Sequence, residues 1–443
     1  MRGLLLAVLL AVVVFSAASH AGGQSSFFQS SQESSPGSNA SIDKQEVKTY
    51  TLPPDRYEKA VAYSKAQYRL HFIGVAYSLV VLLIMLSLRI APAIRDKVER
   101  ISRRRFVQAL IFVPLVLLVF DLFKFPLDAY YHRLAVKYDI SVQGWGSWLW
   151  DWTKAELLQF LIAAILIYFL VGVIRRSPSR WWLYSGLGSF PLIAFLLFIS
   201  PLLIDPLFNN FTPLETTQPG LVEEIEKVVM HAGLDIPRER IFEMSASEKV
   251  NAINAYVTGF GASKRVVVWD TTIAKMTPPQ TLFVVGHEMG HYVLGHIPKG
   301  IAFAGVLITV VLLLVHFAMK RALGRRQRQW ALRGLDDWAS FPALLMFVYL
   351  FSFFAEPVFN SYSRFQEHQA DVYGLEVVHG IVPDSAQTAA EAFQILGEVD
   401  LADPAPGAFI KFWLYSHPPL AERIAFAREY DPWSNGHTPM FVR

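Results

Sequence analysis

The chain of 443 residues is more apolar than soluble proteins of this length, because 53% of its residues are hydrophobic and only 17% are charged. This composition places the protein in a membrane. The net charge of +3 gives no support to nucleic-acid binding, and the lack of cysteine excludes disulfide bonds and thiolate metal ligands. Any bound metal must therefore be held by histidines and carboxylates.

The first 21 residues have the features of a secretory signal peptide. A basic start at Arg2 precedes the apolar run Leu4–Phe15, and the small residues Ser19 and Ala21 fit cleavage after Ala21. The same segment is equally compatible with a short, uncleaved first span. Residues 22–45 are rich in Ser, Gln and Gly, so we expect a disordered linker over residues 22–60.

Six apolar stretches along the chain are each near the ~20 residues that a helix needs to cross a bilayer. They cover residues 71–88, 106–124, 155–174, 181–204, 300–319 and 338–360. We expect residues 61–212 to hold transmembrane helices and loops, and residues 300–360 to hold two further transmembrane helices. With the N-terminal segment, the chain has six to seven spans.

Basic residues predict the orientation in the membrane. The loops after the first, third and fifth spans carry clusters of arginine and lysine, within residues 89–105, 175–180 and 320–333. These loops share one side of the membrane if the six spans are real, and short basic loops stay in the cytoplasm. The long segments 205–299 and 361–443 then face away from the cytoplasm.

The segment 213–299 is the first long stretch that is compatible with a soluble fold. Residues 215–233 have the apolar spacing of an amphipathic helix. Residues 250–260 and the β-branched run 265–269 flank a turn-prone stretch and predict a hairpin. An exposed edge of this hairpin could bind an extended peptide as an extra strand, but a purely structural hairpin fits these residues equally well.

The run His287-Glu288-Met289-Gly290-His291 is the strongest chemical signal in the chain. On a helix, its two imidazoles lie four residues apart on one face and can hold one zinc ion, while Glu288 stays free to act as a general base. The preceding residues 279–286 are apolar with helical spacing, which predicts that the motif lies in a buried helix.

Zinc needs a third protein ligand and an open position for water. His296 is near, but the three-histidine pattern requires Gly and His three and six residues after the second His, and here they follow at Gly295 and His296. Glu367 and Asp371 fit better, because on a helix both carboxylates point the same way. One can bind the metal while the other accepts the N–H of a ligating imidazole. An ordinary surface helix with spaced acids is the alternative.

Ionisable residues within or at the edges of the predicted spans include Glu156, His316 and Glu356. Such side chains are costly in a membrane unless they face protein or water. They either line a hydrated chamber or lie at the membrane interface.

These motifs together resemble those of the type I CAAX prenyl endopeptidases, which are integral-membrane zinc proteases. The resemblance rests on the helix His287–His291 with His296, on Ser363-Arg364-x-x-Glu367-x-x-Ala370-Asp371, and on Ser416-His417-Pro418-Pro419 with Arg423. Upstream, Asn254-Ala255 with the run 267–271 is similar to that family's substrate-strand hairpin. The resemblance covers about residues 45–430.

The fold that the resemblance implies is a mainly α-helical polytopic membrane protein, with six to seven spans around a chamber. A gluzincin-type α+β zinc metallopeptidase domain closes this chamber. We expect residues 213–299 to form the part of this domain with the zinc-binding helix, and residues 361–443 to form its C-terminal part with the third ligand.

The resemblance also implies the roles of individual residues. The implied ligands of one zinc ion are His287, His291 and Glu367, with Glu288 as the base and Asp371 beside a ligand. The residues expected at the substrate are His417, near the scissile carbonyl, together with Asn254, Ala255 and Arg423.

The implied activity is zinc-dependent hydrolysis of peptide bonds in a peptide or protein substrate at the lipid bilayer. Eukaryotic relatives remove the C-terminal tripeptide of prenylated proteins. Because prenylation occurs in the cytosol and the zinc helix is predicted on the other side, the alternative is a quality-control metalloprotease that acts on misfolded or exported proteins. A catalytically inactive membrane scaffold is a further alternative, against which the intact motif argues.

Overall fold

The computed structural model describes residues 47, 49–259, 264–434 and 436–442, and the predicted signal segment 1–21 lies outside this range. Helices dominate the described chain. They are α2 (Pro54–Ser87), α3 (Ile90–Ile101), α4 (Arg105–Lys137), α5 (Trp145–Arg176), α6 (Trp181–Ile199), α7 (Asp205–Phe208), α8 (Pro219–His231), α9 (Asp270–Lys275), α10 (Pro278–Val293), α11 (His296–Arg326), α12 (Phe341–Val378), α13 (Ser385–Val399), α14 (Ala408–Leu414) and α15 (Leu420–Glu429).

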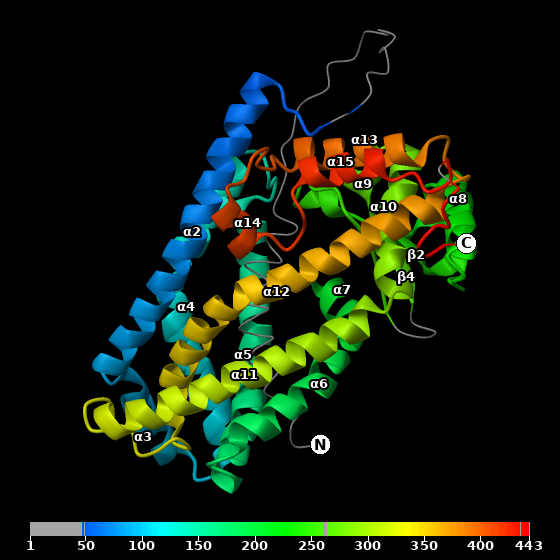
Figure 1. Cartoon of the computed structure of the whole chain (residues 1–443). Coiled ribbons are helices and arrows are strands. Elements are labelled where there is room, and N and C mark those ends of the chain that lie inside the picture. The colour runs from blue at the N-terminus through cyan, green and yellow to red at the C-terminus, as the bar shows by residue number, and fades with distance from the viewer. Residues whose placement is uncertain (1–46, 48, 260–263, 435, 443) are drawn as a thin grey trace.

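Six helical segments of the described chain are long and apolar enough to cross a membrane, and each contains all or nearly all of one predicted span. They are Pro54–Ser87, Arg105–Lys137, Trp145–Arg176, Trp181–Phe208, His296–Arg326 and Trp338–Val378. Figure 1 shows these helices as an elongated cage, with the strands and α8, α9, α10, α13 and α15 gathered at one end. The predicted fold class, a mainly helical polytopic protein with a small α+β unit, is confirmed.

The first span begins earlier than predicted. Because α2 starts at Pro54, residues 54–60 are helical and do not belong to the linker predicted over residues 22–60. Charged residues lower the hydropathy of this part, which kept it out of the predicted span 71–88. Ala60 and Tyr63 pack with Leu401 in one buried cluster. The N-terminal half of α2 therefore joins the membrane helices to the soluble part.

The last span also continues beyond its predicted end. The boundary predicted between residues 360 and 361 falls inside α12, which is continuous from Phe341 to Val378. Hydropathy falls after residue 360, but no glycine or proline occurs between residues 358 and 373 to end the helix. One helix therefore carries both a membrane span and the acidic residues predicted at the metal.

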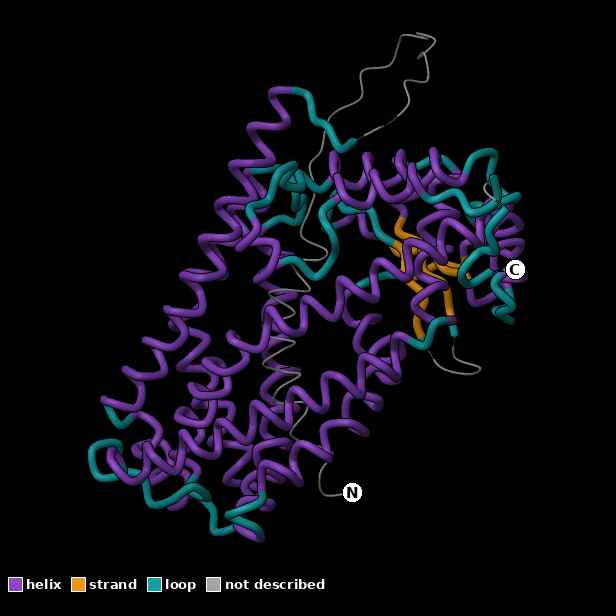
Figure 2. The backbone as a smooth tube through the Cα atoms, in the orientation of Figure 1, coloured by secondary structure: helices purple, strands orange, loops and turns teal. Residues whose placement is uncertain are grey.

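A four-stranded sheet with the order β1-β2-β4-β3 lies among the helices at this end (Figure 2). Its strands are β1 (Phe211–Pro213), β2 (Ile241–Met244), β3 (Ala255–Thr258) and β4 (Arg265–Trp269). Strands β3 and β4 pair antiparallel, with Ala255 opposite Val268, which confirms the predicted hairpin. Its first strand is shorter than predicted, and β3 forms an edge of the sheet.

Two large hydrophobic cores hold the structure together. One fills the membrane bundle between α2, α4, α5, α6, α11 and α12, and it includes Phe112 and Trp181. The other joins α8, α10, α13, α15 and the sheet, and it includes Phe283 and Met289 of α10. Burial of these apolar residues fixes one face of α10 in the soluble core, which leaves the other face to form a site.

Candidate metal centre and chamber

The motif His287–His291 lies in the second half of α10, a helix whose start is set by local sequence. Thr277 precedes Pro278 at the first helical position, and Oε1 of Gln280 accepts the Thr277 backbone N–H at 2.9 Å. The helix brings Nε2 of His287 to 3.3 Å from Nε2 of His291. The predicted pairing of these imidazoles on one face is thus observed.

Helices α10 and α12 approach each other closely because glycines lie at their crossing. A Cβ atom on Gly374 would lie 3.1 Å from the backbone N of His287, and one on Gly286 would lie 2.7 Å from Cγ1 of Val377. A side chain would clash at Gly286, and at Gly374 it would make a contact tighter than usual. This crossing brings Glu367 of α12 beside the imidazoles of α10.

Three side chains offer ligand atoms that lie within 4.8 Å of one another, namely His287, His291 and Glu367. The carboxylate oxygens of Glu367 lie 3.3 Å from Nε2 of His287 and 3.5 Å from Nε2 of His291. Bonds of about 2.0–2.1 Å at tetrahedral angles separate neighbouring zinc ligands by roughly 3.3–3.4 Å. The spacing of the three groups therefore fits one tetrahedral metal ion with an open fourth position.

The environment of Glu367 also fits a bound metal ion. Its carboxylate is buried, and ring nitrogens of His287, His291 and His417 lie 3.3 to 3.5 Å from its oxygens. A buried carboxylate is costly unless positive charge lies beside it, and a cation between the three groups supplies that charge.

Asp371, one of the two acids predicted to lie on one face of α12, contacts the imidazole of His287. Nδ1 of His287 lies 2.9 Å from Oδ1 of Asp371. Arg423 of α15 donates two hydrogen bonds to the same carboxylate, at 2.6 and 2.9 Å, and its guanidinium lies over the ring of Phe393. Arg423 thus borders the chamber, but its charge is directed at Asp371.

The position of His296 was not predicted from the sequence, because His296 was considered there only as a possible metal ligand. The left-handed residue Gly295 turns the chain between α10 and α11, and Nδ1 of His296 then lies 3.0 Å from Nδ1 of His291. The other ring nitrogen of His296 lies 3.2 Å from Oε1 of Gln369. Each imidazole of the His287 and His291 pair therefore has a polar partner on its far side.

The electrostatics of α10 suit both a cation and a base. Burial lowers the pKa of His287, but hydrogen bonds with Asp371 and Glu367 outweigh it and raise this pKa to about 10. The surroundings of His287 therefore favour positive charge. Burial raises the pKa of Glu288 above its ordinary value, which makes this carboxylate a stronger proton acceptor.

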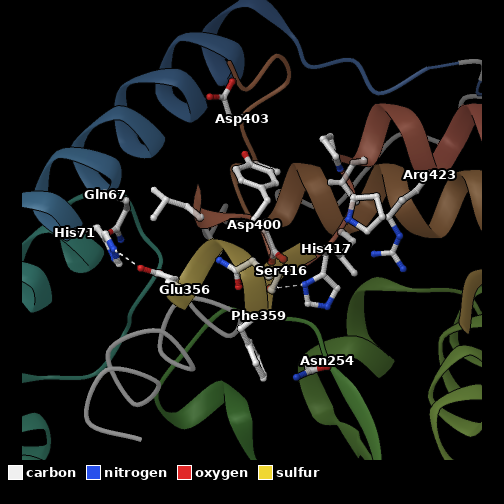
Figure 3. Close-up of a pocket in the computed structure, with 18 of the residues that line it drawn as sticks. Gln67, His71, Asn254, Glu356, Phe359, Asp400, Asp403, Ser416, His417 and Arg423 are labelled. Carbon is white, nitrogen blue, oxygen red and sulfur yellow. Dashed lines mark hydrogen bonds and ion pairs between the residues drawn. The ribbon is translucent and has the colours of Figure 1, made fainter. Parts of the chain in front are cut away.

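The loop before α15 places His417 beside the three clustered groups. Nε2 of His417 lies 3.3 Å from Oε2 of Glu367, and Nδ1 lies 2.9 Å from the hydroxyl of Ser416 (Figure 3). With 45% of its side chain exposed, His417 faces the chamber and is not one of the three mutually close ligand groups.

Asn254 also borders the chamber, immediately before the edge strand β3 (Figure 3). Its backbone is already engaged, because its N–H donates to Oγ1 of Thr272 and its carbonyl accepts from the same hydroxyl, both at 2.7 Å. Ala255 is buried and pairs with Val268. A peptide that extends the sheet would therefore pair with the outer edge of β3.

A cavity of about 590 Å³ extends from the clustered histidines into the helical cage. Its deep end is lined by apolar residues of α2, α11 and α12, which include Val75, Ile308 and Phe353. Glu356 lines this chamber, where it lies 3.1 Å from His71, whereas Glu156 and His316 hydrogen-bond to Gln159 and Trp181 outside it. Of Glu156, His316 and Glu356, the chamber interpretation therefore holds for Glu356.

Known proteins with similar sequences account for both halves of this architecture. The family described as Peptidase family M48 matches residues 215–431, and the family described as CAAX prenyl protease N-terminal, five membrane helices, matches residues 44–210. The uncharacterized metalloprotease YhfN of Bacillus subtilis (strain 168) is 33% identical over 380 residues, which cover 85% of this chain and 87% of that protein. The chain belongs to the CAAX prenyl protease family.

Other members of the CAAX prenyl protease family agree with this assignment. CAAX prenyl protease 1 of Saccharomyces cerevisiae is 25% identical over 419 residues, covering 86% of this chain and 89% of that protein. The crystal structure of S. mikatae Ste24p shares the fold, with a TM-score of 0.71 at 24% identity over 85% of this chain and 89% of that chain. The predicted resemblance is confirmed, and the chain is a membrane metalloprotease.

Proposed function

We propose that the protein is an endopeptidase with one zinc ion held by His287, His291 and Glu367. The observation that carries this proposal is the triangle of their ligand atoms, whose edges of 3.3 to 3.5 Å match a tetrahedral site. The peptidase part would comprise residues 213–299 and 361–443, whose elements share one hydrophobic core.

Zinc in this position would lower the pKa of a bound water from about 15.7 towards about 7 and would polarise the scissile carbonyl. Glu288 lies at the chamber wall, where it would accept the proton of the attacking water and pass it to the leaving amine. Asp371 would keep His287 in the tautomer that leaves Nε2 free for the metal.

His417 would stabilise the negative oxygen that develops on the carbonyl. Desolvation lowers the pKa of His417 although its side chain is partly exposed, which favours the neutral imidazole. If Ser416 donates to Nδ1, the N–H of the ring lies on Nε2, the atom beside Glu367. Removal of one such donor costs about 3–4 kcal/mol in comparable enzymes.

The substrate would be a polypeptide that enters the chamber from the membrane side or along β3, with Asn254, Ala255 and Arg423 near its path. The apolar deep end of the cavity could hold a hydrocarbon chain, which supports a prenylated C-terminus as substrate. We therefore place removal of a C-terminal peptide from prenylated proteins first.

A quality-control metalloprotease remains the second candidate because of the charge distribution. The three basic loops meet at one end of the cage, where Arg89 donates to the Gln329 carbonyl, Arg175 pairs with Asp336, and Arg95 pairs with Asp337. By the positive-inside rule, this end is cytoplasmic and the metal centre faces the other side, where prenylation does not occur. A single cysteine introduced into residues 214–240 of this cysteine-free chain, labelled from either side, tests the orientation.

The catalytic proposal is tested with Glu288→Gln and with Glu239→Gln, an exposed glutamate, as the matched control. We expect Glu288→Gln to bind zinc but to lose peptide cleavage, whereas Glu239→Gln and the unmodified protein cleave in a chelator-sensitive manner. Cleavage retained by Glu288→Gln would refute its role as base. A prenylated CAAX peptide and an unmodified unfolded polypeptide, compared as substrates, separate the two candidate functions.

A further inference from the structure

The chamber wall has an excess of negative groups. Its charged side chains among the described residues are Glu288, Glu356, Asp400, Asp403 and Arg423, together with three histidines. The one guanidinium is neutralised by its ion pair with Asp371. Away from the metal centre, Glu356 lies beside His71, whereas Asp400 and Asp403 have no lysine or arginine among the described lining residues to balance them.

Asp400 is the least satisfied of these carboxylates. Its residue is only 9% exposed, it lines the cavity, and its Oδ1 has no hydrogen-bond partner in the part of the chain that the structure describes. Burial raises the pKa of Asp400 well above its ordinary value, opposed by Lys275. The ammonium of Lys275, however, is directed at the carbonyl of Asn251. A buried acid that lacks a partner is costly unless a ligand completes its environment.

The loop that carries Asp400 is held firmly in the chamber wall. Leu401 is buried with a φ of 46°, a left-handed conformation that non-glycine residues rarely adopt. The carbonyl of Leu401 accepts from Ser64 at 3.4 Å, and the hydroxyl of Tyr50 donates to the Ala402 carbonyl at 3.2 Å. These contacts with α2 and the segment before it position the carboxylate.

Asp403 follows at the same wall and is partly exposed (Figure 3). The hydroxyl of Tyr68 donates to Oδ2 of Asp403 at 3.2 Å and lies 2.8 Å from the hydroxyl of Tyr415. The aromatic rings beside the two acids provide a surface on which the alkyl stem of a long side chain can pack.

We propose that Asp400, with Asp403 at its outer rim, forms a specificity subsite for a lysine or arginine side chain of the substrate. The proposal rests on the peptidase function proposed above and deepens it. A cationic group placed there gives Asp400 the partner that it lacks, while the stem of the side chain contacts Tyr415 and Leu396 of the wall.

Glu356 provides the matched control. It lines the same cavity but lies 3.1 Å from His71, so its carboxylate already has a partner. A general loss of negative charge from the chamber would affect Glu356→Gln and Asp400→Asn alike. If the subsite is specific, only substitutions of Asp400 and Asp403 should change the preference for lysine.

The experiment uses the full-length protein with zinc and a series of quenched fluorescent peptides. In each peptide a single lysine occupies a different position, and its partner has norleucine, which keeps the alkyl stem without the charge. We expect the unmodified protein to prefer lysine at one position by about tenfold in kcat/KM. Asp400→Asn should abolish this preference, Asp403→Asn should reduce it by about threefold, and Glu356→Gln should keep it.

Binding measured in the Glu288→Gln background separates this inference from the proposed function. Anisotropy of labelled peptides should show tighter binding of the lysine peptide, and this difference should vanish when Asp400→Asn is added. If no peptide is cleaved but the binding preference is present, the proposed function fails and the subsite stands. Equal binding and cleavage of lysine and norleucine peptides at every position, or an unchanged preference in a folded Asp400→Asn variant, would overturn the subsite.

Discussion

Replacing Asp371 by alanine removes two contacts that the structure assigns to one carboxylate. Asp371 is 1% exposed, lies 2.9 Å from Nδ1 of His287 and accepts two hydrogen bonds from Arg423. Loss of the first contact should weaken zinc binding by about 10–100-fold. Loss of the second leaves the buried guanidinium of Arg423 unpaired, which should lower the free energy of unfolding by about 3–5 kcal/mol.

The double variant Asp371→Ala/Arg423→Met separates these two effects. Removal of the buried guanidinium should restore most of the thermal stability of the metal-free protein in detergent, but the weakened zinc affinity should persist. Competition with a chromophoric chelator measures the affinity, and unfolding with excess chelator measures the stability. Undiminished zinc affinity in Asp371→Ala, or a double variant as unstable as the single one, would refute this reasoning.

Three further predictions concern the same centre. His296→Ala should weaken zinc binding by about tenfold while the protein stays folded, because His296 contacts the ring nitrogen of His291 that faces away from the proposed metal. Unchanged zinc affinity in a metal titration would exclude this role. Gly374→Ala should lower thermal stability and zinc content together, because its Cβ would meet the His287 backbone. Gly300→Ala should change neither, because nothing lies within 4 Å of a Cβ at that position. Equal melting temperatures of the two variants would contradict the close crossing of α10 and α12. Burial raises the pKa of Glu288, and this base must be deprotonated to act. The value of kcat/KM should therefore fall with decreasing pH at a pKa above the ordinary 4.5. A decrease only below pH 4.5, with zinc still bound, would argue against Glu288 as the base.

The sequence predicted the parts of the site whose geometry follows from helical spacing. Four-residue intervals placed His287 with His291 and Glu367 with Asp371, each pair on one face of a helix, and the structure shows both pairs facing each other. The six spans were predicted from hydropathy alone, because their apolar segments match the thickness of a bilayer.

Features that depend on contacts between distant segments could not be predicted in this way. The crossing at Gly374 and the turn at Gly295 determine where α12 and His296 lie, and no local pattern specifies either contact. The start of α2 and the end of α12 were predicted wrongly, because hydropathy marks where a helix leaves the membrane and not where the helix itself begins or ends. The lining of the chamber depends on the rotation of each helix, which hydropathy does not determine.

The proposed peptidase activity depends on one zinc ion between two imidazoles of α10 and the carboxylate of α12. X-ray diffraction from crystals of active protein, with data collected on both sides of the zinc absorption edge, tests it most directly. We expect a single anomalous peak in contact with Nε2 of His287, Nε2 of His291 and the carboxylate of Glu367, and no peak in Glu367→Ala. An active protein whose map shows no metal at this position, or a metal that Glu367 does not contact, would contradict the account.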